Sequence, residues 1–501
     1  MPTSSTRWPA CGGSRDARRR RSASRSRPCA WRRCPSSRSS CRRRSTRCAG
    51  ASCRPPTRFR TSCAEAGVAS GRRRDWMPPS MNPLPRRSFL ASGALAGLSA
   101  LSGCAAAPAV RVRRVTSGPK FHWRGYYDKL LFDPQDRLLL ANEVDFQGRT
   151  PTPADSIRVG MVDLGDGDRW TELGSTSAWN WQQGCMLQWV PGTADTVAWN
   201  DREDGRFVTR LVEARSGRRR TLPHPFYTFS PDGRTAFAPD FARLDVTRPG
   251  YGYATGADRD IWKLHRAPED AGIWRMDVAS GRRKLVYSFA QAAALPFTGP
   301  AAAAPKADAV HWFNHLLCNT DGTRLFFLHR WRNPGDRAGF RTRALTMDFD
   351  GGRVHVMDPN GGTSHFVWRD PQHVFAWAWH PSHGERFYLY RDLSDHVEVV
   401  GKDVMTVNGH NTYVPNTGDA WVLNDTYPQG PDRVQRPYLY HVPTGRKVEI
   451  GAYPTDPAIV GKEWRCDTHP SANRAGSAFC FDSVHEGGRQ VYVAEIGDLV
   501  R

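Results

Sequence analysis

Residues 464–493 read WRCDTHPSANRAGSAFCFDSVHEGGRQVYV, and this stretch has the pattern of a small antiparallel unit. His469 leads a short first strand, a polar turn follows at 473–476, and a second strand is expected over 477–481. A third strand is expected over 489–495, where the residue types alternate with a period of two. The unit is too small to bury a core alone, so its repetition along the chain decides the fold.

Six further stretches carry the same order of strand, turn and strand, with Pro, Asp, Asn or Gly in the turn. Their turns lie around Pro134, Pro191, Pro231, Thr320, Asp370 and Pro415. Most units continue with a further strand and another polar turn, which gives about four short strands per unit, as in a propeller blade. The sequence therefore predicts an all-β fold, a seven-bladed β-propeller over residues 121–501.

Two long segments, 240–271 and 291–308, interrupt the repeats between the third and fourth turns. Loops of this length in a compact domain are usually functional lids or are disordered. The chain has no G-x-S-x-G motif, which argues against an attached α/β-hydrolase domain. It also has no phosphate-binding glycine loop.

The net charge of +22 is concentrated in the first 80 residues. These residues contain 21 Arg, no Lys and 3 acidic residues, a balance of +18 that leaves only +4 for the other 421 residues. A nucleic-acid-binding surface on the folded part is therefore not expected. Residues 1–80 also lack apolar periodicity, so we predict a disordered Arg/Ser/Cys-rich extension, which need not be translated.

A complete export signal begins at Met81. A twin-Arg pair, Arg86 and Arg87, precedes the apolar run 89–101, which is too short to span a bilayer as a stable anchor. The run ends in LSGC, which resembles a bacterial lipobox and implies cleavage before Cys104 and lipidation of its thiol. The expected segments are the extension (1–80), a Tat-type lipoprotein signal peptide (81–103), a tether (104–120) and the propeller (121–501).

Export predicts a periplasmic or cell-surface protein that is attached to the membrane by its lipid anchor. Seven of the twelve Cys lie in residues 1–80, at spacings that fit no zinc pattern. Two of the four Cys beyond Cys104 could pair in an oxidising compartment, but each is expected to behave as a small buried side chain.

Four consecutive units carry a His six residues before the equivalent turn position: His315, His365, His410 and His469. Equal register on equivalent strands implies equivalent positions in neighbouring blades, near the start of the innermost strand and facing the central channel. Two or three imidazoles there could bind one divalent ion. Alternatively, each His makes hydrogen bonds within its own blade, because a repeat copies structural residues as faithfully as functional ones.

The segments 179–189 (WNWQQGCMLQW), 409–428 (GHNTYVPNTGDAWVLNDTYP) and 466–493 resemble TolB-like bacterial propellers related to oligogalacturonate lyases. The resemblance covers roughly residues 121–496. It implies a seven-bladed fold and β-elimination on short uronate chains, with a divalent ion of the Mn type held by His and Gln, a His base and an assisting Arg. At the spacing of the family's Gln-x-x-His-x-His cluster, this chain has Met405, Asn408 and His410.

Residue roles follow from this resemblance and from the chemistry of elimination. A neutral His can accept the C5 proton of a uronate, and an Arg or a metal ion can stabilise charge on its carboxylate. Aromatic and amide side chains suit a sugar-binding shelf, although they could equally pack between blades, and each Arg could be a solvated charge at the rim. The candidates are His311 and His365 as bases; Arg330, Arg332 and Arg465 as carboxylate clamps; Trp181, Gln182 and Gln183 as sugar contacts; and His315, His410 and His469 as metal ligands.

The expected function is that of an exported polysaccharide lyase that cleaves acidic, uronate-containing oligosaccharides by metal-assisted β-elimination. One alternative is a non-catalytic TolB-like propeller of the cell envelope that binds a protein or glycan partner. A further alternative is another metal enzyme, such as a hydrolase. The expected partner is thus an acidic oligosaccharide or an envelope protein, and not a nucleic acid.

Overall fold

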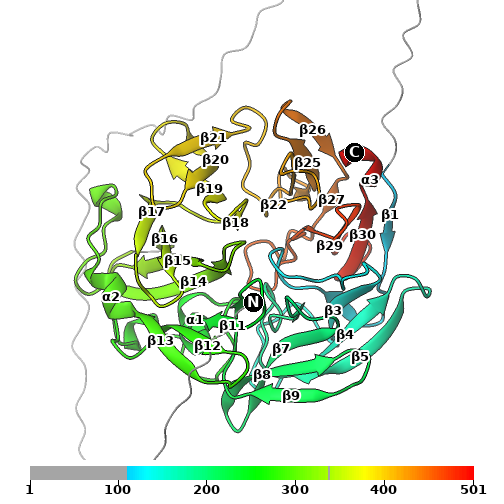
Figure 1. Ribbon diagram of the computed structural model, residues 1–501, viewed down its shortest axis with the longest axis horizontal. Helices are drawn as coiled ribbons and strands as arrows, with labels where there is room; N and C mark the ends of the chain where they lie inside the picture. The colour runs from blue at the N-terminus through cyan, green and yellow to red at the C-terminus, as the bar shows by residue number, and fades with distance from the viewer. Residues whose placement is uncertain (1–109, 337–338) are drawn as a thin grey trace, which may run out of the picture. The chain divides into compact units, whose positions relative to one another are not determined.

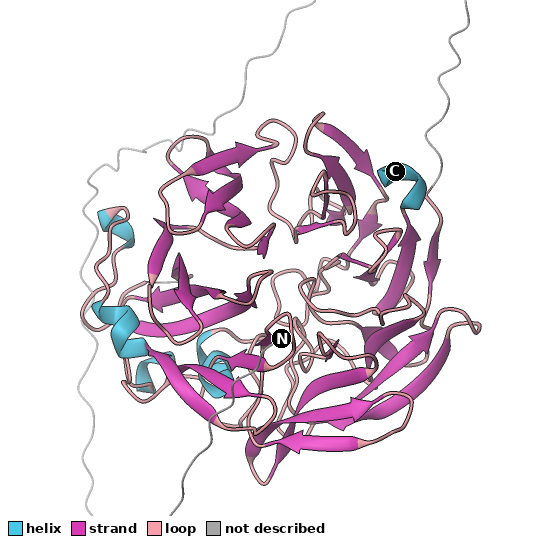
Figure 2. Ribbon diagram, viewed as in Figure 1, coloured by secondary structure: helices cyan, strands magenta, loops and turns pink. Residues whose placement is uncertain are grey.

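Short strands pair into seven antiparallel four-stranded sheets, which stand side by side around a central axis (Figure 1). The computed structural model describes residues 110–336 and 339–501. Helices are few and lie between strands or at the end of the chain (Figure 2). The predicted all-β, seven-bladed propeller is thereby confirmed.

Within each of blades 1 to 6, the strands run in chain order from the centre outward (Figure 1). Blades 1 to 3 contain β2 (Phe121–Trp123), β3 (Leu138–Val144), β4 (Ile157–Asp163) and β5 (Arg169–Thr176); β6 (Gln188–Trp189), β7 (Thr196–Glu203), β8 (Arg206–Glu213) and β9 (Arg219–Leu222); β10 (Thr228–Phe229), β11 (Thr235–Ala238), β12 (Gly272–Asp277) and β13 (Arg283–Ser288).

Blades 4 to 6 repeat this arrangement, and a two-stranded sheet of β24 (Val434–Gln435) and β27 (Tyr453–Pro454) accompanies blade 6. The blade strands are β14 (Val310–Cys318), β15 (Arg324–Arg332), β16 (Arg341–Asp348) and β17 (His355–Gly361); β18 (Phe366–Trp368), β19 (His373–His380), β20 (Gly384–Arg391) and β21 (Val397–Val400); β22 (Thr412–Tyr413), β23 (Trp421–Asn424), β25 (Tyr438–His441) and β26 (Arg446–Glu449).

Blade 7 takes its strands from both ends of the described chain, which closes the ring. These strands are β28 (Ser471–Ala472), β29 (Ala478–Ser483) and β30 (Gln490–Glu495), with β1 (Val112–Arg114) as the outermost strand. The tether predicted over 104–120 is therefore too long, because β1 belongs to the propeller. A strand of three residues is too short to show the alternation that reveals a strand in a sequence.

The strands predicted over 477–481 and 489–495 correspond to β29 and β30. Nearly every residue of both strands is buried, rather than every second one, because each blade packs against a neighbour on either face. Aromatic rings fill the space between blades. The ring centroids of Phe326 in β15 and Phe366 in β18 are 3.9 Å apart and join blades 4 and 5. Burial of each such side chain contributes about 1.5–3 kcal/mol.

The two predicted insertions contain short helices outside the sheets. Between β11 and β12 lies α1 (Phe241–Thr247), whose first turn is capped by the Asp240 carboxylate, which accepts a hydrogen bond from the Arg243 backbone N–H at 2.9 Å. Between β13 and β14 lies α2 (Phe289–Ala294), which begins with a capping box. The remaining short helices are η1 (Ile261–Lys263), η2 (Ala301–Ala303) and α3 (Gly497–Val500).

The predicted extension 1–80, the signal peptide 81–103 and the lipidation site Cys104 lie outside the described residues. Within residues 110–336 and 339–501, no helix is both long enough and apolar enough to cross a membrane. The four cysteines of the described chain are unpaired and buried, which fits their expected behaviour as small core side chains. They are Cys185, Cys318, Cys466 and Cys480.

Candidate functional site

Four buried histidines gather at the centre of the propeller, where blades 4 to 7 meet. The ring centroids of His365 and His410 are 4.1 Å apart, and those of His410 and His469 are 4.2 Å apart. Tyr126, from the loop between β2 and β3, stacks on His315 at 5.2 Å and lies 4.8 Å from His469. The structure thus brings the four histidines of equal register into one group, which we call the central cluster (His315, His365, His410, His469 and Tyr126).

Three potential ligand atoms converge within this region. One atom each of His410, Asp467 and His469 lies within 4.8 Å of the others. Nε2 of His410, Nε2 of His469 and Oδ1 of Asp467 are buried and have no hydrogen-bond partner in the part of the chain that the structure describes. Buried polar atoms are rarely left in this state, and a divalent cation bound by these three residues would give such atoms a partner. Two imidazoles and a carboxylate suit Zn, Mn or Fe, so these residues fit a divalent metal ion.

Hydrogen bonds to the other sides of these ligands fix their orientation. His410 Nδ1 lies 3.0 Å from both carboxylate oxygens of Asp425, so Nδ1 carries the proton and Nε2 keeps a free lone pair. Asp425 also accepts a hydrogen bond from the Thr468 hydroxyl. Arg465 Nε donates to Oδ2 of Asp467 at 2.8 Å, which leaves Oδ1 of that carboxylate free. Carboxylates and cations placed in this way are typical of the surroundings of metal ligands.

The electrostatic environment keeps His469 neutral. Burial holds the pKa of His469 well below its ordinary value, and nearby His410, Arg124 and Arg465 lower it further. The neutral imidazole is the form that binds a metal ion, so protons compete weakly for this ligand at neutral pH.

His365 is oriented beside the ligand group by two polar partners. Its Nδ1 lies 2.9 Å from Asn408 Oδ1, which requires Nδ1 to donate, and its Nε2 then accepts from the Tyr427 hydroxyl at 3.2 Å. Burial, and then the neighbouring His410, lower the pKa of His365 well below its ordinary value. His365 is therefore neutral at pH 7, with a lone pair on Nε2 that can accept a proton.

His315, although predicted to be a ligand, does not belong to the group of three. Its Nδ1 accepts from the Tyr227 hydroxyl at 3.0 Å, and the Gln183 amide nitrogen lies 3.2 Å away. Asp467 is the third member instead, and it was not predicted from the sequence. Asp467 and His469 are two residues apart, a spacing that places both side chains on one side of an extended segment and could have revealed the pair.

Two of the three predicted arginine clamps lie at the central cluster. Arg465 is held by Asp467, and its Nη2 donates to the Tyr251 hydroxyl at 3.0 Å. Arg330 is 5% exposed; its Nε donates to the Thr342 hydroxyl at 3.2 Å, whereas its Nη1 has no partner among the described residues.

The structure does not bring His311 and Arg332 into the central cluster. His311 Nδ1 is 2.9 Å from Nε2 of His329, and Arg343 Nε donates to the other nitrogen of His329 at 3.0 Å. We call this group the blade-4 cluster (His311, His329 and Arg343). Arg332 lies at the end of β15 and donates to the Gly339 carbonyl at 2.9 Å. His311 therefore has a hydrogen-bonding role within its blade.

The predicted sugar contacts are largely used for packing and loop attachment. Trp181 is 1% exposed within an aromatic cluster of blades 1 and 2, so its ring offers no free face to a sugar. Gln182 donates from its amide to the Arg465 carbonyl at 3.1 Å. Gln183 donates to the Tyr227 hydroxyl at 2.6 Å and borders His315, so it alone of the three reaches the central cluster.

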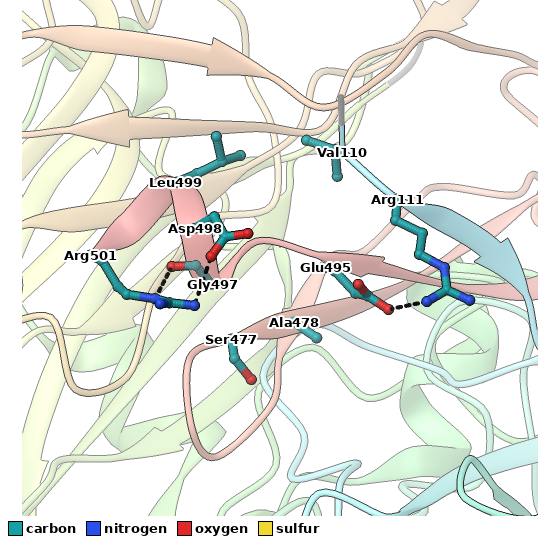
Figure 3. Close-up of a pocket in the computed structure, with 9 residues that line it drawn as sticks. All are labelled: Val110, Arg111, Ser477, Ala478, Glu495, Gly497, Asp498, Leu499 and Arg501. Carbon is teal, nitrogen blue, oxygen red and sulfur yellow. Dashed lines mark hydrogen bonds and ion pairs between the residues drawn. The ribbon is translucent and has the colours of Figure 1, made fainter. Parts of the chain in front are cut away.

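The pocket drawn in Figure 3 lies at the seam of blade 7 and has a volume of about 350 Å³. Its charged side chains pair with each other: Arg111 with Glu495 at 3.5 Å and Arg501 with Asp498 at 2.7 Å (Figure 3). These side chains are more than half exposed, and ion pairs of this kind contribute little free energy. None of the predicted site residues lines this pocket.

No protein-family profile and no curated protein sequence matches this chain. Among solved structures, its fold is similar to an oligogalacturonate lyase from Vibrio parahaemolyticus, with a TM-score of 0.55 and 13% sequence identity over 78% of this chain and 95% of that chain. It is equally similar to an oligogalacturonate lyase in complex with manganese, with a TM-score of 0.55 and 14% identity over 78% of this chain and 94% of that chain.

TolB from Acinetobacter baumannii also matches, at a TM-score of 0.33 and 12% identity over 70% of this chain and 78% of that chain, which is too distant to support an argument. At these identities the comparisons establish the propeller fold alone. The resemblance to oligogalacturonate lyases that the sequence indicated is thus confirmed at the level of the fold.

Proposed function

We propose that this protein is a metal-dependent lyase that cleaves uronate-containing oligosaccharides by β-elimination. The observation that carries the proposal is the convergence of three buried potential ligands, His410, Asp467 and His469, each with a side-chain atom that has no partner among the described residues, beside a neutral His365. The likeness of the fold to two lyase structures, one of them in complex with manganese, supports the same choice.

Elimination from a uronate requires a base for the C5 proton and a positive field for the charge that develops on the carboxylate. A divalent ion held by His410, Asp467 and His469 would supply a Lewis acid for that carboxylate. Arg465 adds a planar cation at the same place, because its bond to Asp467 holds its guanidinium beside the ligand group.

His365 is the base that the geometry favours. Its Nδ1–H remains bonded to Asn408, while Nε2 takes the C5 proton. The electrons of the C5–H bond become the C4–C5 double bond, the C4–O bond breaks, and the leaving oxygen takes a proton. Tyr427 places its hydroxyl at His365 Nε2, and burial holds the pKa of that hydroxyl well above its ordinary value, so it is protonated in the resting protein. If the hydroxyl turns from Nε2 to the leaving oxygen, it gives up its proton there, and the proton that Nε2 took from C5 then passes to the tyrosinate and restores both residues.

We also propose that the protein is exported and anchored by a lipid on Cys104. The support is the order of the twin-Arg pair, the apolar run and the LSGC sequence. An envelope location would give the enzyme access to acidic oligosaccharides from outside the cell. If the protein only binds a protein or glycan of the envelope, it will show no turnover.

The test is an absorbance assay for the unsaturated uronate end that elimination creates. Full-length protein is mixed with trigalacturonate with added manganese, after removal of metal by a chelator, and with the chelator present. We expect product with metal, none with the chelator, and none from His365→Ala with metal. Product formation that is unaffected by the chelator, or by His365→Ala, would contradict the proposal, as would the lack of any product.

A further inference from the structure

Arg330 differs from the other buried arginines in its lack of compensation. It makes one hydrogen bond, to the Thr342 hydroxyl, and has no carboxylate or carbonyl partner among the described residues. Each of the others donates to a carboxylate or to backbone carbonyls: Arg124, Arg243, Arg324, Arg343 and Arg489. A buried guanidinium without such partners is costly, so its retention points to a partner that the chain does not supply.

A second unpaired guanidinium lies next to Arg330. Arg248, which ends α1 in the first insertion, has a buried Nε without a partner and no ion pair within the described ranges. The guanidinium carbon of Arg248 is 5.1 Å from the centroid of the Phe340 ring, and that of Arg330 is 4.6 Å from the same centroid. Burial, and then the charge of Arg248, lower the pKa of Arg330 to about 10, so Arg330 is still a cation at neutral pH.

Tyr251 connects this pair of cations to the central cluster. Its ring centroid is 4.9 Å from the guanidinium carbon of Arg248 and 5.3 Å from the His315 ring, and its hydroxyl accepts from Arg465. Arg330 also lowers the pKa of His315, second only to burial. The two uncompensated charges therefore border the residues that would carry out the elimination.

We propose that Arg248 and Arg330 form an anion site that binds a carboxylate of the oligosaccharide on a sugar next to the reacting one. This inference rests on the proposed function. A carboxylate matches the planar fork of a guanidinium and would relieve the cost of holding the buried charge of Arg330 near the half-buried charge of Arg248. The site then selects chains with at least two acidic sugars, and the insertion that carries Arg248 contributes to specificity.

The test measures binding without catalysis. Titration calorimetry is performed on full-length protein with a chelator present, so that no metal ion holds a carboxylate. The ligands are trigalacturonate and its fully methyl-esterified form, which has the same shape without charge. We expect the acid to bind at least 10-fold more tightly than the ester, and Arg330→Gln and Arg248→Gln each to weaken binding of the acid by about 10- to 100-fold.

Arg341→Gln is the matched control, because Arg341 is an exposed cation on the adjacent strand β16. We expect this variant to bind trigalacturonate with the affinity of the wild type. Arg330→Lys keeps the charge but not the fork, and should recover part of the affinity if the protein has folded, as its thermal unfolding will establish. Acid binding by Arg330→Gln that stays within 2-fold of wild type would overturn the inference, and so would the lack of acid binding by wild type.

The outcomes separate this inference from the proposed function. If the wild type converts trigalacturonate and both arginine variants bind it unchanged, the lyase proposal stands and the anion-site proposal is contradicted. If binding of the acid depends on the two arginines but no unsaturated product ever forms, the anion-site proposal stands and the lyase proposal is contradicted.

Discussion

Two groups of buried histidines in this propeller differ in how their nitrogen atoms are used. In the blade-4 cluster, His311 and His329 bond to each other and Arg343 completes the group; neither ring has a nitrogen among the buried atoms without a partner. In the central cluster, Nε2 of His410 and of His469 are left without a partner. Burial lowers the pKa of His311 as it lowers that of His469, so burial and pKa do not distinguish the two groups.

Unsatisfied nitrogen atoms, and not burial, distinguish the central cluster from the blade-4 cluster. A structural cluster stabilises the fold by completing its own hydrogen bonds, whereas a binding site leaves atoms for the ligand to complete. The same contrast separates the two arginines, since Arg343 donates to three backbone carbonyls and Arg330 to none.

The largest expected effect is on catalysis. His410→Ala should lower the rate of elimination by about 10³-fold or more, because it removes a metal ligand next to the base. His329→Ala, in the blade-4 cluster, should retain activity at a temperature where it is folded. Initial rates of both variants are measured with saturating trigalacturonate and manganese. Comparable rates in the two variants would contradict the distinction between the central cluster and the blade-4 cluster.

His329→Ala should instead destabilise the protein by about 2–4 kcal/mol, because it opens a cavity and leaves Arg343 and His311 without their partner. Denaturant unfolding of this variant and of His410→Ala, with a chelator present, measures the difference. A smaller loss of free energy in His329→Ala than in His410→Ala would reverse our assignment of the two clusters.

Acid should weaken the fold through the blade-4 cluster. Burial, and then the charges of Arg343 and Arg243, lower the pKa of His311 to about 4 from an ordinary value of 6.5. The unfolded state therefore binds more protons between these two pH values. The contribution of His311 to the free energy of unfolding is fully present above pH 6.5, and about 3 kcal/mol of it is lost when the pH reaches 4. Denaturant unfolding across this range should show a smaller slope in His311→Gln than in wild type; equal slopes would contradict the shift.

The smallest expected effect is on stability, where substitutions of two buried arginines should act in opposite directions. Arg343→Gln should lower the free energy of unfolding by about 1–3 kcal/mol, since it leaves buried carbonyls without a donor. Arg330→Gln should raise the unfolding temperature of the ligand-free protein, because it removes a buried charge that nothing in the described chain compensates. Thermal unfolding of both variants without ligand provides the check, and destabilisation by Arg330→Gln would mean that this charge is compensated.

Much of the fold could be predicted from the sequence because each blade has its own turn chemistry and strand alternation. Repetition of one unit also gave the register of His365, His410 and His469, which the structure brings together. The closing strand β1 could not be predicted, since its three residues form a strand only by pairing with β30 at the other end of the chain.

The site was predicted less completely, for local reasons. In a regular strand His311 and His315 would face the same side, but a bulge at His315 shifts the register of β14 and ends this equivalence. Asp467 was missed because the comparison of repeats followed one residue type. Arg248 lies in an insertion, where no other repeat offers a residue for comparison.

The most direct test of the account is titration calorimetry of manganese into metal-free, full-length protein and into its Asp467→Ala variant. The account predicts one bound ion per wild-type chain and at least a 10-fold weaker affinity in the variant, because the carboxylate of Asp467 is one of the three converging potential ligands. No binding by wild type, or equal affinity in Asp467→Ala, would contradict it.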